Sequence, residues 1–101
     1  MSKFAVAWLA FGAVIAMSAI TSPAYAEDAK AYCRNYAQAA IEQSRAARQI
    51  SRCHHYIRDT PARWTLNYND HFNWCMSVYG TGDNASERRA RENALSECSR
   101  G

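Results

Sequence analysis

Glycine and proline are scarce in this sequence: the 101 residues include four Gly and two Pro, and residues 28–58 contain neither. Internal repeats, low-complexity tracts and Pro- or Ser-rich linkers are also lacking, and apolar and polar side chains do not alternate over more than a few residues. The missing alternation argues against β-strands. Residues 28–58 are rich in Ala, Gln, Glu and Arg, which favour helix. We therefore expect an all-α protein.

Catalytic motifs are missing as well. The sequence has no Cys-x-x-Cys pair for redox chemistry, no histidine in a nucleophile motif and no pair of acidic residues on an apolar face. We expect the protein not to be an enzyme and to need no cofactor.

The first 26 residues have the pattern of a cleavable secretory signal. Lys3 is their only charged side chain, residues 4–20 form an apolar run, and the segment ends in Ala-Tyr-Ala at 24–26. A transmembrane anchor is the alternative, but a run of about 17 residues is at the short limit for crossing a bilayer. We expect cleavage before Glu27, export to the periplasm or out of the cell, and no membrane span in the mature chain.

All four cysteines, Cys33, Cys53, Cys75 and Cys98, lie in the expected mature chain. An even number of cysteines in a short exported protein indicates two disulfides rather than free thiols. Each bridge stabilises such a domain by about 2–4 kcal/mol. Residues 27–101 are therefore expected to form one domain, a disulfide-stapled helical hairpin or three-helix arrangement.

The longest helix is predicted over residues 29–57. Apolar side chains in this stretch recur at about 100° per residue and form one broad stripe, which includes Ile50 and His54. Asp28 is a suitable N-cap, and Pro61 prevents the helix from continuing. Both Ile50 and His54 are thus expected to face the core.

A second helix is predicted over residues 68–79. Asn67 is a suitable N-cap, and the stretch Gly-Thr-Gly-Asp-Asn at 80–84 breaks the helical pattern. His71 and Cys75 fall on its inward face.

A third helix is predicted over residues 85–99, beginning with Asn84 and Glu87 as a capping box. Arg91 is expected to be largely solvated, together with Glu87. Four side chains are expected to face inward: Ala90, Ala94, Leu95 and Cys98.

The disulfide pairing depends on residues 80–84. If this break is a jog, the second and third helices run back together along the first, which pairs Cys53 with Cys75 and Cys33 with Cys98. If the chain reverses there, Cys53 meets Cys98 and Cys33 meets Cys75. Sequence alone leaves both pairings open. We favour the first, nested pairing because it matches the helix lengths.

Two histidines suggest an alternative, metal-binding role. His54 and His71 are expected to flank the Cys53–Cys75 bridge, and imidazoles suit zinc or copper. The bridge would remove both thiolates, however, and the spacing fits no established zinc motif. We favour no metal site and interpret these histidines as hydrogen-bonded residues at the core edge, with His55 in solvent.

Aromatic side chains are dense between residues 64 and 79. They either form a small core or a platform that stacks on a sugar or peptide, and we favour the core. Trp64 and Trp74 are the candidate contact residues, and Trp74 is expected to be the more exposed of the two.

Arginines predominate among the cations of the mature chain, which would contain eleven Lys and Arg and nine Asp and Glu. This excess is too small to indicate nucleic acid binding. Arg34, Arg45, Arg48 and Arg52 lie within a sector of about 60° opposite the predicted core, which also includes Ile41. Such a row either binds an anionic partner or is an ordinary solvated face.

The sequence thus predicts a small exported helical protein that acts as a binding or structural module. Regulation or inhibition of a partner protein and binding to anionic envelope surfaces are two forms of this role. A periplasmic metal-handling protein is the second hypothesis, and an enzyme is the third.

Overall fold

The protein is all-α in the computed structural model, which describes residues 23–100; the predicted signal lies mostly outside them. These residues form four α-helices and no strand. The helices are α2 (Pro23–Gln49), α3 (His54–Asp59), α4 (Tyr68–Ser77) and α5 (Asp83–Ser99), with 3-10 turns η2 (Ser51–Cys53) and η3 (Pro61–Trp64). Within the described part of the chain, no helix is both long and apolar enough to cross a membrane.

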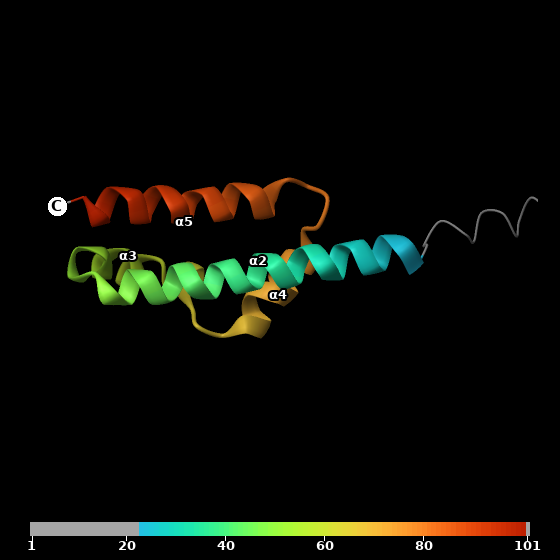
Figure 1. The fold of residues 1–101 in the computed structure, drawn as a ribbon, viewed down its shortest axis with the longest axis horizontal. Coiled ribbons are helices and arrows are strands. Elements are labelled where there is room, and N and C mark those ends of the chain that lie inside the picture. Colours follow the sequence, from blue (N-terminus) through green and yellow to red (C-terminus); the bar gives the residue numbers. More distant parts are fainter. Residues whose placement is uncertain (1–22, 101) are drawn as a thin grey trace, which may run out of the picture.

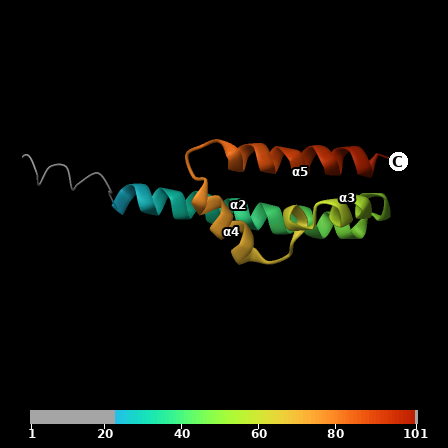
Figure 2. The ribbon, with the colours of Figure 1, turned by 180° about the vertical axis from the view of Figure 1, so that it is seen from behind.

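Helix α2 is the longest of the described helices, and the later elements pack along it (Figure 1). The chain turns back through α3 at the C-terminal end of α2, and α4 then packs against the side of α2. Helix α5 starts near the middle of α2 and runs parallel to it, so that the C-terminus lies near α3 (Figures 1 and 2).

The predicted single helix over 29–57 is wrong, because α2 ends at Gln49. Ile50 is extended, with φ −114° and ψ 111°, and η2 and α3 follow it in a new direction. No glycine or proline marks the break. Ile50 packs against the cluster around Cys53 and Trp64, so tertiary contacts override the helix propensity here.

The break also changes the environment of His54, which is exposed rather than inward-facing. Its Nε2 lies 2.9 Å from the carbonyl oxygen of Arg48, near the end of α2. The last carbonyls of a helix have no partner within the helix, and His54 satisfies one of them.

The cysteines pair as Cys33–Cys75 and Cys53–Cys98, so the nested pairing favoured above is wrong. The chain reverses between α4 and α5 instead of making a jog. Gly80 and Gly82 both have φ of 90°, a conformation that glycine adopts without strain, and they allow this reversal. All four cysteines lie within residues 23–100, and none of them is free.

The beginnings of α4 and α5 differ in how well they match expectation. Asn67 caps α4 as predicted, since its side chain accepts a hydrogen bond from the backbone N–H of Asp70. Helix α5 instead begins at Asp83 after Gly82, and the predicted Asn84 capping box is wrong. Asn84 is buried, and its amide nitrogen lies 3.5 Å from Sγ of Cys75.

Two hydrophobic clusters form the core of residues 23–100, one around each disulfide. The distal cluster surrounds Cys53–Cys98, and the proximal cluster surrounds Cys33–Cys75. The buried members of the distal cluster are Ala47, Cys53, Trp64, Ala94 and Cys98. The buried members of the proximal cluster are Cys33, Tyr36 and Cys75, with Phe72, Met76 and Tyr79 partly buried against them.

Candidate binding cleft

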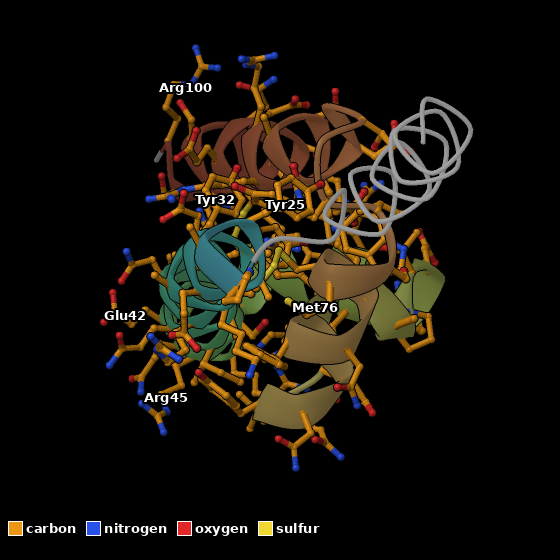
Figure 3. The ribbon with its side chains drawn as sticks, turned by 90° about the vertical axis from the view of Figure 1, so that its right-hand side faces the viewer. Tyr25, Tyr32, Glu42, Arg45, Met76 and Arg100 are labelled. Atoms are coloured by element: carbon orange, nitrogen blue, oxygen red, sulfur yellow. A yellow bond between two sulfur atoms is a disulfide. The ribbon has the colours of Figure 1, made fainter. Side chains whose placement is uncertain are left out.

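The predicted arginine row is interrupted. Arg34 and Arg45 are exposed on α2, and Figure 3 shows Arg45 projecting away from α4 and α5. The Arg48 side chain is held by intramolecular hydrogen bonds, because its Nη1 donates to the carbonyl of Trp64 at 2.7 Å and to that of Ser44 at 3.0 Å. Arg52 lies in η2, after the helix break at Ile50, and so is not on the same helix as the other three arginines.

Ile41, which was expected to share the solvent-facing arginine sector, is buried. The core-facing surface of α2 is therefore wider than the apolar stripe indicated, because several elements pack against this helix.

The two candidate tryptophans have opposite environments. Trp64 is only 1% exposed and belongs to the distal cluster, so it is not available as a contact residue. Trp74 is 37% exposed, which confirms the expectation that it is the more accessible. Its ring lies 5.8 Å from that of Tyr36, between centroids.

The two candidate metal-binding histidines lie on different helices, and the Cys53–Cys75 bridge that they were expected to flank does not form. His71 is buried as predicted, and its Nε2 lies 2.7 Å from the carbonyl oxygen of Thr65. Residues 23–100 contain no cluster of three or more His, Cys, Asp or Glu side chains suited to a metal ion.

A cleft of about 580 Å³ brings four elements together. Its walls come from α2, η3, α4 and α5. The lining residues are Tyr36, Pro61, Ala62, Arg63, Thr65, Asp70, His71, Trp74, Glu87 and Arg91. Of the candidate site residues predicted from the sequence, the cleft contains Trp74 and His71 and none of the four arginines of the predicted row.

Arg91 is the most buried charged residue of the cleft lining, and its predicted solvation is wrong: it is 0% exposed. Its Nε donates to Oε1 of Gln43 on α2 at 2.7 Å. Its Cζ lies 5.0 Å from the centroid of the Tyr36 ring, a cation–π arrangement. Its Nη2 has no hydrogen-bond partner among the described residues.

Glu87 is shared between two guanidinium groups. It accepts two hydrogen bonds from Arg63, at 2.6 Å and 3.2 Å, which form a bidentate ion pair between η3 and α5. The same carboxylate is 3.9 Å from Nη1 of Arg91. Arg63 thus takes most of the available negative charge, and Arg91 is incompletely neutralised for a buried ion.

Two titratable groups on the cleft walls have shifted pKa values. Burial raises the pKa of Tyr36, and both a side-chain hydrogen bond with Arg91 and the positive charge of Arg91 act in the opposite direction. Burial lowers the pKa of His71, while its hydrogen bond to the Thr65 carbonyl acts in the opposite direction. At neutral pH both side chains are therefore uncharged, and they add hydrogen-bonding and apolar surface rather than charge.

The sequence contained a sign of the burial of Arg91. It precedes Ala94 by three residues and Cys98 by seven, so it falls on the same helical stripe as these inward residues. Its charge led to the prediction that it is solvated. The spacing was the better guide, because a long arginine can be buried where a carboxylate and a ring lie beside it.

A scan against protein-family models and searches of curated proteins and of solved structures found no match to this chain.

Proposed function

We propose that this protein is an exported binding module whose cleft receives a segment of a partner protein. The two disulfides are consistent with an oxidising, extracytoplasmic location. The secretory pattern of residues 1–26 supports the same location.

The observation that carries this proposal is the pairing of Arg91 with Trp74 in one cleft. Arg91 is a fully buried cation with an unsatisfied Nη2, and Trp74 is a large aromatic side chain that is 37% exposed. Tryptophan and arginine are the side chains most enriched at the centres of protein interfaces. Leaving both incompletely used is costly in a small domain, and a bound partner would compensate for this cost.

Rigidity supports a binding role. Every wall of the cleft belongs to a segment that a disulfide or an ion pair holds: α2 and α4 through Cys33–Cys75, and η3 and α5 through Arg63–Glu87. A preorganised site loses little conformational entropy on binding, which favours affinity.

Site-specific photo-cross-linking in the exporting cell tests the proposal. A benzophenone amino acid at position 74 is expected to cross-link a partner protein, and Arg91→Lys is expected to reduce this product. Tyr68 is the matched control, because it is 38% exposed and lies on the same helix but outside the cleft lining. Equal products from positions 68 and 74, or none from position 74, would contradict the proposal.

A further inference from the structure

We infer that the cleft recognises a carboxylate carried beside a flat apolar group. This inference rests on the proposed binding function and specifies the chemistry of the ligand. It depends on three features of the lining: an incompletely paired guanidinium, an aromatic wall and a nearly balanced charge.

The guanidinium of Arg91 provides the anion-binding group. Oε1 of Gln43 accepts from its Nε, and Tyr36 shares a side-chain hydrogen bond with it, whereas the carboxylate of Glu87 lies 3.9 Å from its Nη1 and is engaged by Arg63. Guanidinium groups match carboxylates geometrically, and charge-assisted hydrogen bonds are about twice as strong as neutral ones. Arg91 lines the cleft, but its Nη2 is itself buried, so a carboxylate that supplies the acceptor Nη2 lacks must reach below the present surface of the cleft.

The aromatic wall lies directly beside this guanidinium. The Tyr36 ring contacts the Arg91 cation on one side and the Trp74 ring on another, with 5.8 Å between the two ring centroids. Pro61 and Ala62 add apolar surface from η3. A ligand whose anionic and flat apolar groups are adjacent would therefore contact both features at once.

The charge of the lining selects for a single negative charge. Two arginines, Arg63 and Arg91, are accompanied by two carboxylates, Glu87 and Asp70. Both carboxylates repel any anion, but they repel a doubly charged phosphate about twice as strongly as a monoanion at the same distance. The cleft is therefore expected to prefer a carboxylate over a phosphate of the same shape.

Titration of the exported protein with four probes, and with benzyl phosphate for comparison, tests this inference. The probes are 3-phenylpropionate, 3-phenylpropanamide, and an acetylated tripeptide ending in phenylalanine with a free or an amidated C-terminus. Binding is followed by NMR through the indole N–H signal of Trp74 and the Nε–H signals of arginine. We expect each carboxylate to bind at least about tenfold more tightly than its amide. We also expect benzyl phosphate to bind more weakly than 3-phenylpropionate.

Two variants assign the effect to the cleft. Arg91→Gln is expected to remove the preference for carboxylate, and the matched control Arg89→Gln, an exposed position on the same helix, is expected to keep it. If Arg91→Gln does not fold, Trp74→Ala replaces it, because this partly exposed side chain is not part of a core cluster. Trp74→Ala is expected to weaken the binding of all four probes. Because this variant lacks the indole signal, its binding is followed through the arginine signals.

The outcomes distinguish a protein C-terminus from a small free acid as the source of the carboxylate. They also distinguish a failure of this inference from a failure of the proposed function. Tighter binding of the free-acid tripeptide than of 3-phenylpropionate indicates a protein C-terminus, and the reverse order indicates a small free acid. Equal binding of acids and amides, or of acids and phosphate, overturns the inference, as does the absence of any binding. In those cases cross-linking at position 74 still decides whether the cleft binds a partner.

Discussion

The two disulfides of this protein close loops of similar size but hold together different kinds of core. The distal cluster around Cys53–Cys98 is filled by Trp64, which is 1% exposed, and by four partly buried apolar or aromatic side chains. The proximal cluster around Cys33–Cys75 has Tyr36 at its centre. Beside Tyr36 lie Arg91 and His71, and the cleft opens there.

This contrast shows how a short chain combines a closed core with a binding cleft. The Trp64 indole fills the distal end with apolar volume, although its Nε1 is a buried donor without a partner among the described residues. At the proximal end the Tyr36 ring packs against the buried guanidinium of Arg91. This charged group requires polar partners, so apolar side chains cannot fill that end of the core completely. The disulfide stabilises the proximal end where packing alone is less complete.

The two tryptophans are expected to differ most in their contribution to the free energy of unfolding. Trp64→Ala is expected to lower the free energy of unfolding by about 3–5 kcal/mol, because it leaves a cavity in the distal cluster. Trp74→Ala is expected to cost less than about 1 kcal/mol, because the side chain is partly exposed. Urea denaturation followed by circular dichroism measures both values. Similar losses for the two variants would show that Trp74 contributes as much to packing as Trp64 does.

The disulfides give the next largest effect and test whether packing or loop closure dominates. The bridges span 42 and 45 positions along the chain, so the loop-closure model gives nearly equal stabilisation. Replacing Cys33 and Cys75 together by Ala, or Cys53 and Cys98 together, is expected to cost about 2–4 kcal/mol in each case. A much larger loss at one end would indicate that packing decides. Peptide mapping without reduction should recover these same two pairs.

His71 makes the stability of the proximal end depend on pH. Because its pKa is lowered in the folded state, the unfolded chain binds the proton more readily. The stabilisation is present above the unfolded pKa of about 6.5 and is lost as the pH falls through the lower folded pKa. The melting temperature is therefore expected to fall between about pH 7.5 and about pH 5.5.

The matched variants identify the histidine responsible for this dependence. His71→Gln keeps a donor for the Thr65 carbonyl and is expected to reduce the fall in melting temperature. His55→Gln, at an exposed position, is expected to leave it unchanged. An equal reduction in both variants would assign the pH dependence to surface charge instead.

The smallest effect concerns the arginines of α2. Arg45→Gln is expected to change the free energy of unfolding by no more than about 0.5 kcal/mol, because the side chain is exposed. Arg48→Gln is expected to cost about 1 kcal/mol, because it removes hydrogen bonds to two carbonyls. Thermal denaturation compares them. If Arg45 also contacts anionic surfaces, its loss should weaken salt-sensitive binding to anionic vesicles.

Local patterns in the sequence predicted much of this fold. Composition gave the helical class, and the even number of cysteines gave the two bridges. Asn67 and Trp74 were predicted correctly because a helix cap and the exposed side of one short helix depend on neighbouring residues.

The features that the sequence did not reveal depend on contacts between distant segments. The helix break at Ile50 has no local breaker and arises from packing against the distal cluster. The disulfide pairing depends on the direction that the chain takes after Gly80 and Gly82. Arg91 was misjudged because its partners Gln43 and Tyr36 come from α2, about 50 residues away along the chain.

The parallel course of α2 and α5 also has an electrostatic consequence. Each helix carries a macrodipole equivalent to about half a negative elementary charge at its C-terminal end, and the Cys53–Cys98 bridge brings these two ends together. Arg48, Arg52 and Arg100 lie at this end of the chain's helices. Two arginines of the predicted row, Arg48 and Arg52, thus offset the negative ends of the protein's own helices. Arg34 and Arg45 are then the cations of the row that remain available to contact an anionic partner.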